Sequence, residues 1–175
     1  MFRALLLSFL LCTLVAYLSA CGFTPTYSKY EKSNASSELT QIKIDLIPNQ
    51  EGQKLRNILI DRFYQSGYPL NPKYTLNIAP IEEKLRDLDV TITSDTTRAQ
   101  MKLTSEMTLI DNETDKVLLK RSLKSITSYN VLGSEFATRV TEKNARDNAI
   151  NDIARQIERA IILHIKFTPT SQAGQ

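Results

Sequence analysis

The longest run of alternating residues constrains the fold of this chain most. Between residues 98 and 109, apolar side chains alternate with polar ones. The apolar set is Ala99, Met101, Leu103, Met107 and Leu109. A period of two places every second side chain on the same face of a β-strand, so this run predicts a long strand with one buried face. Residues 74–78, 88–92 and 117–130 are also strand-like, with polar turns between the later runs, which predicts an antiparallel meander.

Two helices and an initial strand complete the predicted domain. Residues 41–47 alternate, with Ile42, Ile44 and Leu46 expected on one face of a strand. Asn49 is the expected N-cap of a helix that ends near Ser66, and a second helix is expected over residues 141–165. We predict an α+β domain over residues 42–167, in the order β-α-β-β-β-α. Its four-stranded, mostly antiparallel sheet has one face packed by two helices.

The first 20 residues predict an export signal. Arg3 precedes a largely apolar stretch over residues 4–18, which is too short to cross a hydrocarbon core of about 30 Å as a helix. The following Leu18-Ser19-Ala20-Cys21 resembles the lipobox of bacterial lipoproteins. We therefore expect cleavage between Ala20 and Cys21 and acylation of the Cys21 thiol.

Acylation of Cys21 predicts where the domain lies. One acyl chain anchors a protein only marginally, whereas the two or three chains of a bacterial lipoprotein anchor it stably. Residues 21–41 would form the acylated start and a polar tether, and residues 168–175 a frayed tail. Gly22 stands where many inner-membrane lipoproteins carry Asp, which predicts the outer membrane, on its periplasmic side.

The residue types needed for most catalysis are scarce. The chain has one histidine, two cysteines and five glycines, so we expect no metal site, phosphate loop or cofactor other than the acyl chains on Cys21. The best acidic candidates are the pairs Glu82-Glu83 and Asp87/Asp89, and an envelope enzyme would use Glu82, Asp87 and Asp89. A solvated strand face opposite Leu88 also explains the two aspartates, and we predict no enzyme. A net charge of +3 is far from the signature of a nucleic-acid-binding domain.

One cluster of basic residues has two interpretations. Lys116, Lys120, Arg121 and Lys124 occur with no acid between Lys116 and Gly133. Lysines at the edge of a sheet deter pairing with other sheets, which is the structural interpretation. The functional interpretation is a patch that binds the phosphates or carboxylates of lipid headgroups.

Several blocks of the sequence, in this order, resemble the LptE family of lipopolysaccharide-assembly lipoproteins, in its alphaproteobacterial form. The blocks are Cys21-Gly22-Phe23-Thr24-Pro25-Thr26-Tyr27, Leu55-Arg56-Asn57-Ile58-Leu59-Ile60-Asp61-Arg62-Phe63 with Gly67, Ser128-Tyr129-Asn130-Val131, Phe136-Ala137-Thr138, and a closing helix with Ala145, Ala154, Gln156 and Ile157. Thr26 departs from the pattern, because the family typically has a large aliphatic residue there.

The resemblance implies a function without catalysis. LptE-like proteins sit as plugs inside the β-barrel LptD, help it to fold and take part in delivering lipopolysaccharide to the outer leaflet. Lys116, Lys120, Arg121 and Lys124 then become the hypothetical lipopolysaccharide contacts. The alternative is an unrelated envelope lipoprotein that carries a small ligand or acts as a scaffold.

Overall fold

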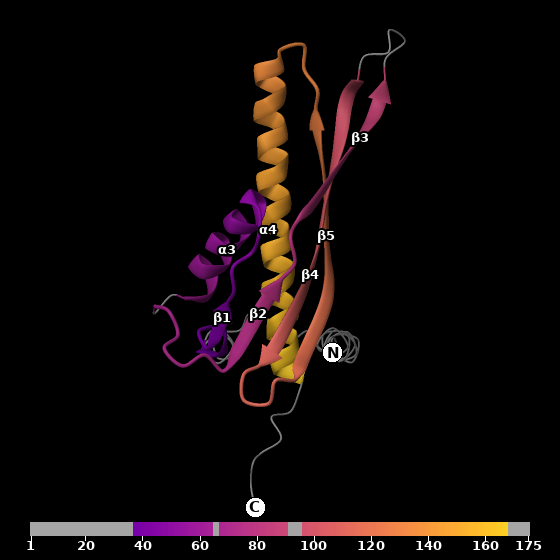
Figure 1. The fold of residues 1–175 in the computed structure, drawn as a ribbon. Helices are drawn as coiled ribbons and strands as arrows, with labels where there is room; N and C mark the ends of the chain where they lie inside the picture. The colour runs from indigo at the N-terminus through magenta and orange to yellow at the C-terminus, as the bar shows by residue number, and fades with distance from the viewer. Residues whose placement is uncertain (1–36, 65–66, 91–95, 168–175) are drawn as a thin grey trace, which may run out of the picture. The chain divides into compact units, whose positions relative to one another are not determined.

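The computed structural model describes residues 37–64, 67–90 and 96–167, which form an α+β domain (Figure 1). In chain order its elements are β1 (Ile42–Ile44), α3 (Gln50–Phe63), β2 (Tyr74–Ile78), β3 (Glu82–Val90), β4 (Thr96–Asp111), β5 (Val117–Asn130) and α4 (Glu135–Phe167). The predicted α+β class is confirmed. The predicted count of four strands is wrong, because these residues form a five-stranded sheet.

The sheet is organised around β4. Strand β5 pairs antiparallel with one side of β4 along most of its length. The other side of β4 is shared, because β2 pairs with residues 107–111 and β3 with residues 96–104, both antiparallel. Strand β1 adds to β2 in parallel, so the sheet is mixed.

The extra strand arises from an interruption at Pro80. Proline has no backbone N–H and therefore interrupts a ladder of strand hydrogen bonds. After Pro80 the chain continues in the same direction along β4. Strands β2 and β3 are therefore consecutive segments that pair with the same side of β4. The Ser105 hydroxyl donates to the Ala79 carbonyl at 2.7 Å and the Ala79 N–H donates to the Glu106 carbonyl at 2.9 Å, which hold the break against β4.

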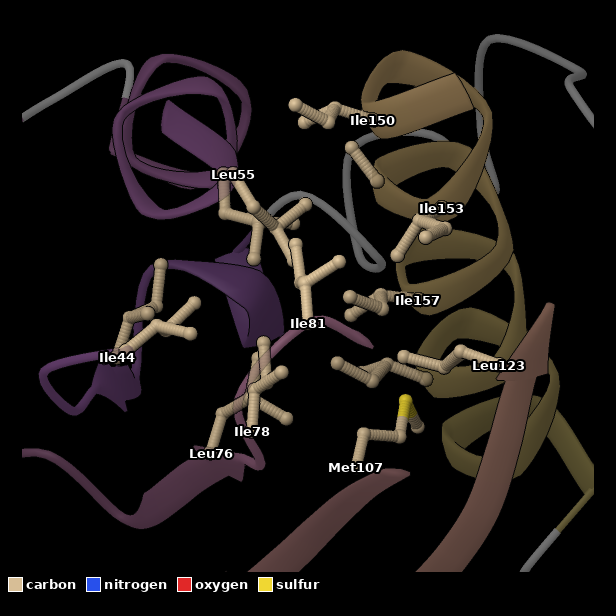
Figure 2. Close-up of a cluster of buried hydrophobic side chains, with 14 of the residues drawn as sticks. Ile44, Leu55, Leu76, Ile78, Ile81, Met107, Leu123, Ile150, Ile153 and Ile157 are labelled. Atoms are coloured by element: carbon tan, nitrogen blue, oxygen red, sulfur yellow. The ribbon is translucent and has the colours of Figure 1, made fainter. Parts of the chain in front are cut away.

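The hydrophobic core lies between one face of the sheet and the two helices. The apolar residues of β4 predicted to be buried are all buried, which confirms the alternation. Figure 2 shows Leu55 of α3, Ile153 of α4 and Leu76 of β2 within this cluster. Leu39 is also buried in the core, although it lies within the segment predicted to be a tether.

Element boundaries differ from the predictions where polar residues or short strands obscure the pattern. Helix α4 begins at Glu135 rather than near 141, and Ser134 is placed at its start, where its carbonyl accepts from the Thr138 N–H at 3.0 Å. Helix α3 ends at Phe63, before Ser66. Leu46 was predicted to face the core but is 76% exposed, because β1 ends at Ile44 and Ile47 fills the core instead.

The N-cap of α3 leads to a first prediction. The Asn49 side chain accepts from the Gly52 N–H at 2.8 Å, as predicted for this cap. A Cβ on Gly52 would lie 2.6 Å from Ile47 Cγ2 and 3.1 Å from the Ile47 carbonyl oxygen. Ile47 is buried and its branched side chain has little room to move. We expect Gly52→Ala to lower the free energy of unfolding by about 1–3 kcal/mol, as overpacking does, although alanine favours helices.

Urea denaturation measures this change, with Gly133→Ala as the matched control. A Cβ on Gly133 would meet nothing within 4 Å, so that variant should stay within about 0.5 kcal/mol of the parent. Equal stability of the two variants would contradict the tight packing at Gly52.

Candidate anion-binding face

The two faces of the sheet differ in their covering. Both helices pack on the face that carries the odd-numbered residues of β4, as Figure 1 shows for α3 and α4 on one side of the sheet. The even-numbered residues of β4 point to the opposite face, which no described helix covers. We call this the outer face.

Cations dominate the outer face. Because directly paired residues share a face, the register of the strands identifies its members. Its described basic residues are Lys43 on β1, Lys84 and Arg86 on β3, Arg98 and Lys102 on β4, and Lys120 and Lys124 on β5. The described acidic residues on it are Glu82 and Glu106. The excess of positive charge would attract an anion to this side of the molecule.

Three lysines on neighbouring strands form the centre of this face, and we call them the lysine triad: Lys84, Lys102 and Lys124. Lys84 lies directly opposite Lys102. Lys124 lies opposite Thr104 and is therefore diagonal to Lys102. Such neighbours have their Cβ atoms roughly 5–8 Å apart. Three lysines whose Cβ atoms are this close can direct their flexible side chains toward one ligand that carries several phosphate or carboxylate oxygens.

The charges of the triad are not compensated within the described part of the chain. None of the three lysines forms an ion pair with another described residue, whereas Lys120 pairs with Glu106 at 3.2 Å. Like charges directly opposite each other on a sheet are destabilising. The arrangement of Lys84 and Lys102 therefore costs stability in the free protein, and a bound anion would relieve that cost.

The structure separates the four basic residues that the sequence groups together. Lys116 precedes β5 in the turn after β4, and Lys120 and Lys124 lie on the outer face. Arg121 pairs with Met107 and so belongs to the opposite face. The sequence alone does not place Lys84 and Lys102 in this group, because the pairing of β3 with β4 is not encoded locally. Cys21 and Ala20, the predicted acylation and cleavage residues, lie outside the described residues.

The acidic candidates for an enzyme do not form one site. Glu82 lies on the outer face, whereas Asp87 pairs with Ala99 and lies on the opposite face. The side chain of Asp89 is outside the described part. The prediction that Leu88 faces the core is wrong: it is 41% exposed, and the register shifts at the bulge between Asp87 and Asp89.

A half-buried ion network ties β3 to α4 on the helix side of the sheet. The Arg146 guanidinium donates to both Glu83 carboxylate oxygens, at 2.7 and 2.8 Å, and to Glu142 at 2.5 Å. The hydrogen bonds with Glu83 raise the pKa of Arg146 above its ordinary value. Burial, followed by the nearby charges of Glu142 and Glu83, raises the pKa of Tyr129. These groups are engaged with one another, which indicates a structural network.

In the part of the chain that the structure describes, no group of three or more His, Cys, Asp or Glu residues is arranged to hold a metal ion. No helix there is both long and apolar enough to cross a bilayer.

Comparison with known proteins gives a family match and several structures of the same fold. The family model described as "LptE: Lipopolysaccharide-assembly" matches residues 39–165. A search of curated proteins found no significant match.

Three of the structural neighbours are described as lipoproteins. A candidate lipoprotein of Caulobacter crescentus has a TM-score of 0.59 at 16% identity, covering 78% of this chain and 98% of its own. A minor lipoprotein of Acinetobacter baumannii has a TM-score of 0.53 at 19% identity, covering 71% and 91%. The rare lipoprotein B of Shewanella oneidensis has a TM-score of 0.50 at 9% identity, covering 67% and 93%. At these identities the likeness establishes the fold alone.

The uncompensated lysines lead to a second prediction. We expect Lys102→Gln to raise the free energy of unfolding by about 0.5 kcal/mol at low salt, because it removes the repulsion with Lys84. The gain should shrink as salt is added, since the screening length falls from about 30 Å at 0.01 M to about 3 Å at 1 M. Urea denaturation at both salt concentrations measures the effect.

Lys120→Gln is the control for this experiment. It removes a lysine from the same face but also loses the ion pair with Glu106, so it should bring no gain. The repulsion would be contradicted if Lys102→Gln were no more stable than the parent. It would also be contradicted if the gain in the free energy of unfolding did not depend on the salt concentration.

Proposed function

The chain belongs to the LptE family, and from this premise we propose that it is an outer-membrane lipoprotein that plugs and helps to assemble an LptD-like β-barrel, which delivers lipopolysaccharide to the outer leaflet. The observation that carries the proposal is the family match, which spans the folded body from before β1 nearly to the end of α4. The description of the family names lipopolysaccharide assembly. The role as a plug of the barrel is a proposal beyond that description.

The uncovered sheet face is compatible with a plug. The interior of a large outer-membrane barrel is polar, so a body placed inside it needs a polar exterior. The outer face alternates with the core along β4 and carries charged and hydroxyl side chains such as Lys102, Thr104 and Thr108. The buried apolar residues form one cluster on the other side, which gives the body a core of its own.

The predicted lipid anchor would hold the domain at the membrane. Acylation of Cys21 would place it on the periplasmic side of the outer membrane, within reach of a barrel embedded there. Anchoring restricts the search for the partner to the membrane surface, which raises the effective concentration of both proteins.

The lysine triad is the proposed contact for lipopolysaccharide. The phosphates and acidic sugars of this lipid suit several ammonium groups on one face. Ile126 lies directly opposite Lys102 and is 47% exposed, so an apolar side chain stands beside the cations. This combination fits an anionic amphiphile better than a fully hydrophilic polyanion. Lys120 and Lys124 of the predicted contact set share the face, whereas Arg121 does not.

A third prediction tests the barrel partner. Capture of the tagged protein from outer membranes in mild detergent should bring down a large β-barrel in a one-to-one ratio. If the acylated protein is recovered from the membrane without a barrel, the plug role is wrong. An envelope lipoprotein that carries a small ligand or acts as a scaffold would then be the better description.

A fourth prediction tests the lipopolysaccharide contact with two double variants that each lose two positive charges. Lys84→Gln/Lys102→Gln alters the triad, and Lys116→Gln/Arg121→Gln alters cations in the turn and on the other face. We expect the first to weaken binding of the purified protein to lipopolysaccharide about tenfold, the size expected for two charge-assisted contacts at a partly exposed site. The second should change affinity little.

Binding is measured by titration with lipopolysaccharide at fixed salt, because the affinity of exposed charges depends on salt. Equal affinity of the two variants would remove the triad as the contact. A larger loss in the second variant would restore the contact set predicted from the sequence.

A further inference from the structure

Among the described residues, the sheet has three strand edges without a neighbouring strand, and two of them are capped by side chains. At β1, the Tyr64 hydroxyl donates to the Ile42 carbonyl at 2.7 Å and accepts from the Ile44 N–H at 3.1 Å. One phenol therefore occupies two of the outward backbone groups of β1, and the Arg56 guanidinium donates to a third, the Ile44 carbonyl, at 3.4 Å. Capping of this kind is how proteins protect exposed edges.

The edge of β5 is capped by α4. The Gln156 side chain donates to the Lys124 carbonyl at 2.9 Å, and the Thr141 hydroxyl donates to the Asn130 carbonyl at 2.9 Å. Two carbonyls of this edge, six residues apart, are thus already used. A strand added to β5 would have to displace side chains of the helix.

The outward backbone groups of β3 follow from the register. The Val131 N–H donates to the Thr97 carbonyl at 3.0 Å, so odd-numbered residues of β4 bond toward β5 and even-numbered ones toward β3. Lys84 and Arg86 face even-numbered residues and therefore bond to β4. The N–H and C=O groups of Glu83, Leu85 and Asp87 point away from the sheet.

This third edge has no cap among the described residues. No described side chain or backbone group bonds the outward amides and carbonyls of Glu83, Leu85 and Asp87. Leu85 is 53% exposed although it pairs with the buried Met101. Figure 1 shows β3 as the outermost strand at its end of the sheet. An uncapped edge that also exposes a leucine is a template for another strand.

The charge pattern of β3 opposes pairing with a second copy of this chain. If two β3 strands paired antiparallel around Leu85, Glu83 would face Asp87 of the other copy and Lys84 would face Arg86. Like charges directly opposite are destabilising, so this register is disfavoured at every charged pair that it forms. A strand with the opposite charges would instead be favoured at the same positions.

We propose that the free edge of β3 binds an extended segment of a partner protein by strand addition. The segment presents acidic side chains opposite Lys84 and Arg86, an aliphatic side chain opposite Leu85 and a basic side chain opposite Asp87. Backbone hydrogen bonds supply the binding and the alternating charges supply the selectivity. This site goes beyond the proposed function and uses backbone groups that the lysine triad leaves free.

A short peptide tests the proposal on the full acylated chain in detergent. The complementary peptide Thr-Lys-Glu-Val-Glu-Thr-Thr places these side chains in antiparallel register. A permuted peptide of the same composition, Thr-Glu-Thr-Val-Lys-Glu-Thr, places like charges opposite Asp87, Lys84 and Glu83. The measurement is hydrogen exchange of single amides, followed by nuclear magnetic resonance.

The expected result is specific to three amides. At about ten times its dissociation constant, the complementary peptide should slow exchange at Glu83, Leu85 and Asp87 about tenfold, because only the free fraction exchanges. The permuted peptide should leave them unchanged. No slowing with either peptide, or equal slowing with both, would overturn the proposal and leave the lysine triad untouched.

A proline at the edge gives a second test. Leu85→Pro removes an outward N–H and preserves the bonds to β4, so the strand is expected to stay paired. Ser122→Pro is the matched control, because the Ser122 N–H also points away from β4, at the edge of β5 that α4 caps. Leu85→Pro should weaken binding of the complementary peptide about fivefold or more, because the loss of one hydrogen bond lowers affinity by about this factor. Ser122→Pro should not, and equal affinity of the two variants would contradict strand addition at β3.

Discussion

The alternation along β4 is the constraint on which the rest of the structure depends. Its 16 residues pair with three other strands, and its odd-numbered side chains line the sheet side of the hydrophobic core. A shift of one residue would move the whole apolar set to the uncovered face. The strand therefore fixes two things at once: which side the helices cover, and which residues remain together on the outer face.

The division between the two faces explains why the cations gather as they do. Lys84 and Lys124 are 40 positions apart in the sequence, and the register of β4 places them on either side of Lys102. On the helix side, Arg146 is held between two carboxylates, so its charge is compensated. Arg146 is thus neutralised within the packed side of the sheet, whereas Lys84, Lys102 and Lys124 form no ion pair with another described residue on the open side, and such an excess of positive charge attracts anions.

Sequence patterns predicted the features of this fold that depend on local periodicity. The buried face of β4, the Asn49 cap and the α+β class follow from spacing and are confirmed. The start of α4 and the exposure of Leu46 were not predicted, because polar residues open the helix and β1 is only three residues long. The lysine triad could not be predicted, because it depends on pairing between strands that lie apart in the sequence. Arg121, grouped with Lys120 by sequence, lies on the opposite face because neighbouring strand residues alternate.

Strand β3 connects the two proposed sites physically. The side chains of Lys84 and Arg86 belong to the cationic outer face, and the backbone of Leu85 between them belongs to the free edge. A partner strand with acidic residues opposite those two cations would neutralise part of the charge available to an anionic ligand. Occupation of the edge and binding of the anion therefore oppose each other through Lys84, and linkage requires each to weaken the other by the same factor. Strand addition at β3 would thus favour release of an anion from the triad, with no change in the fold.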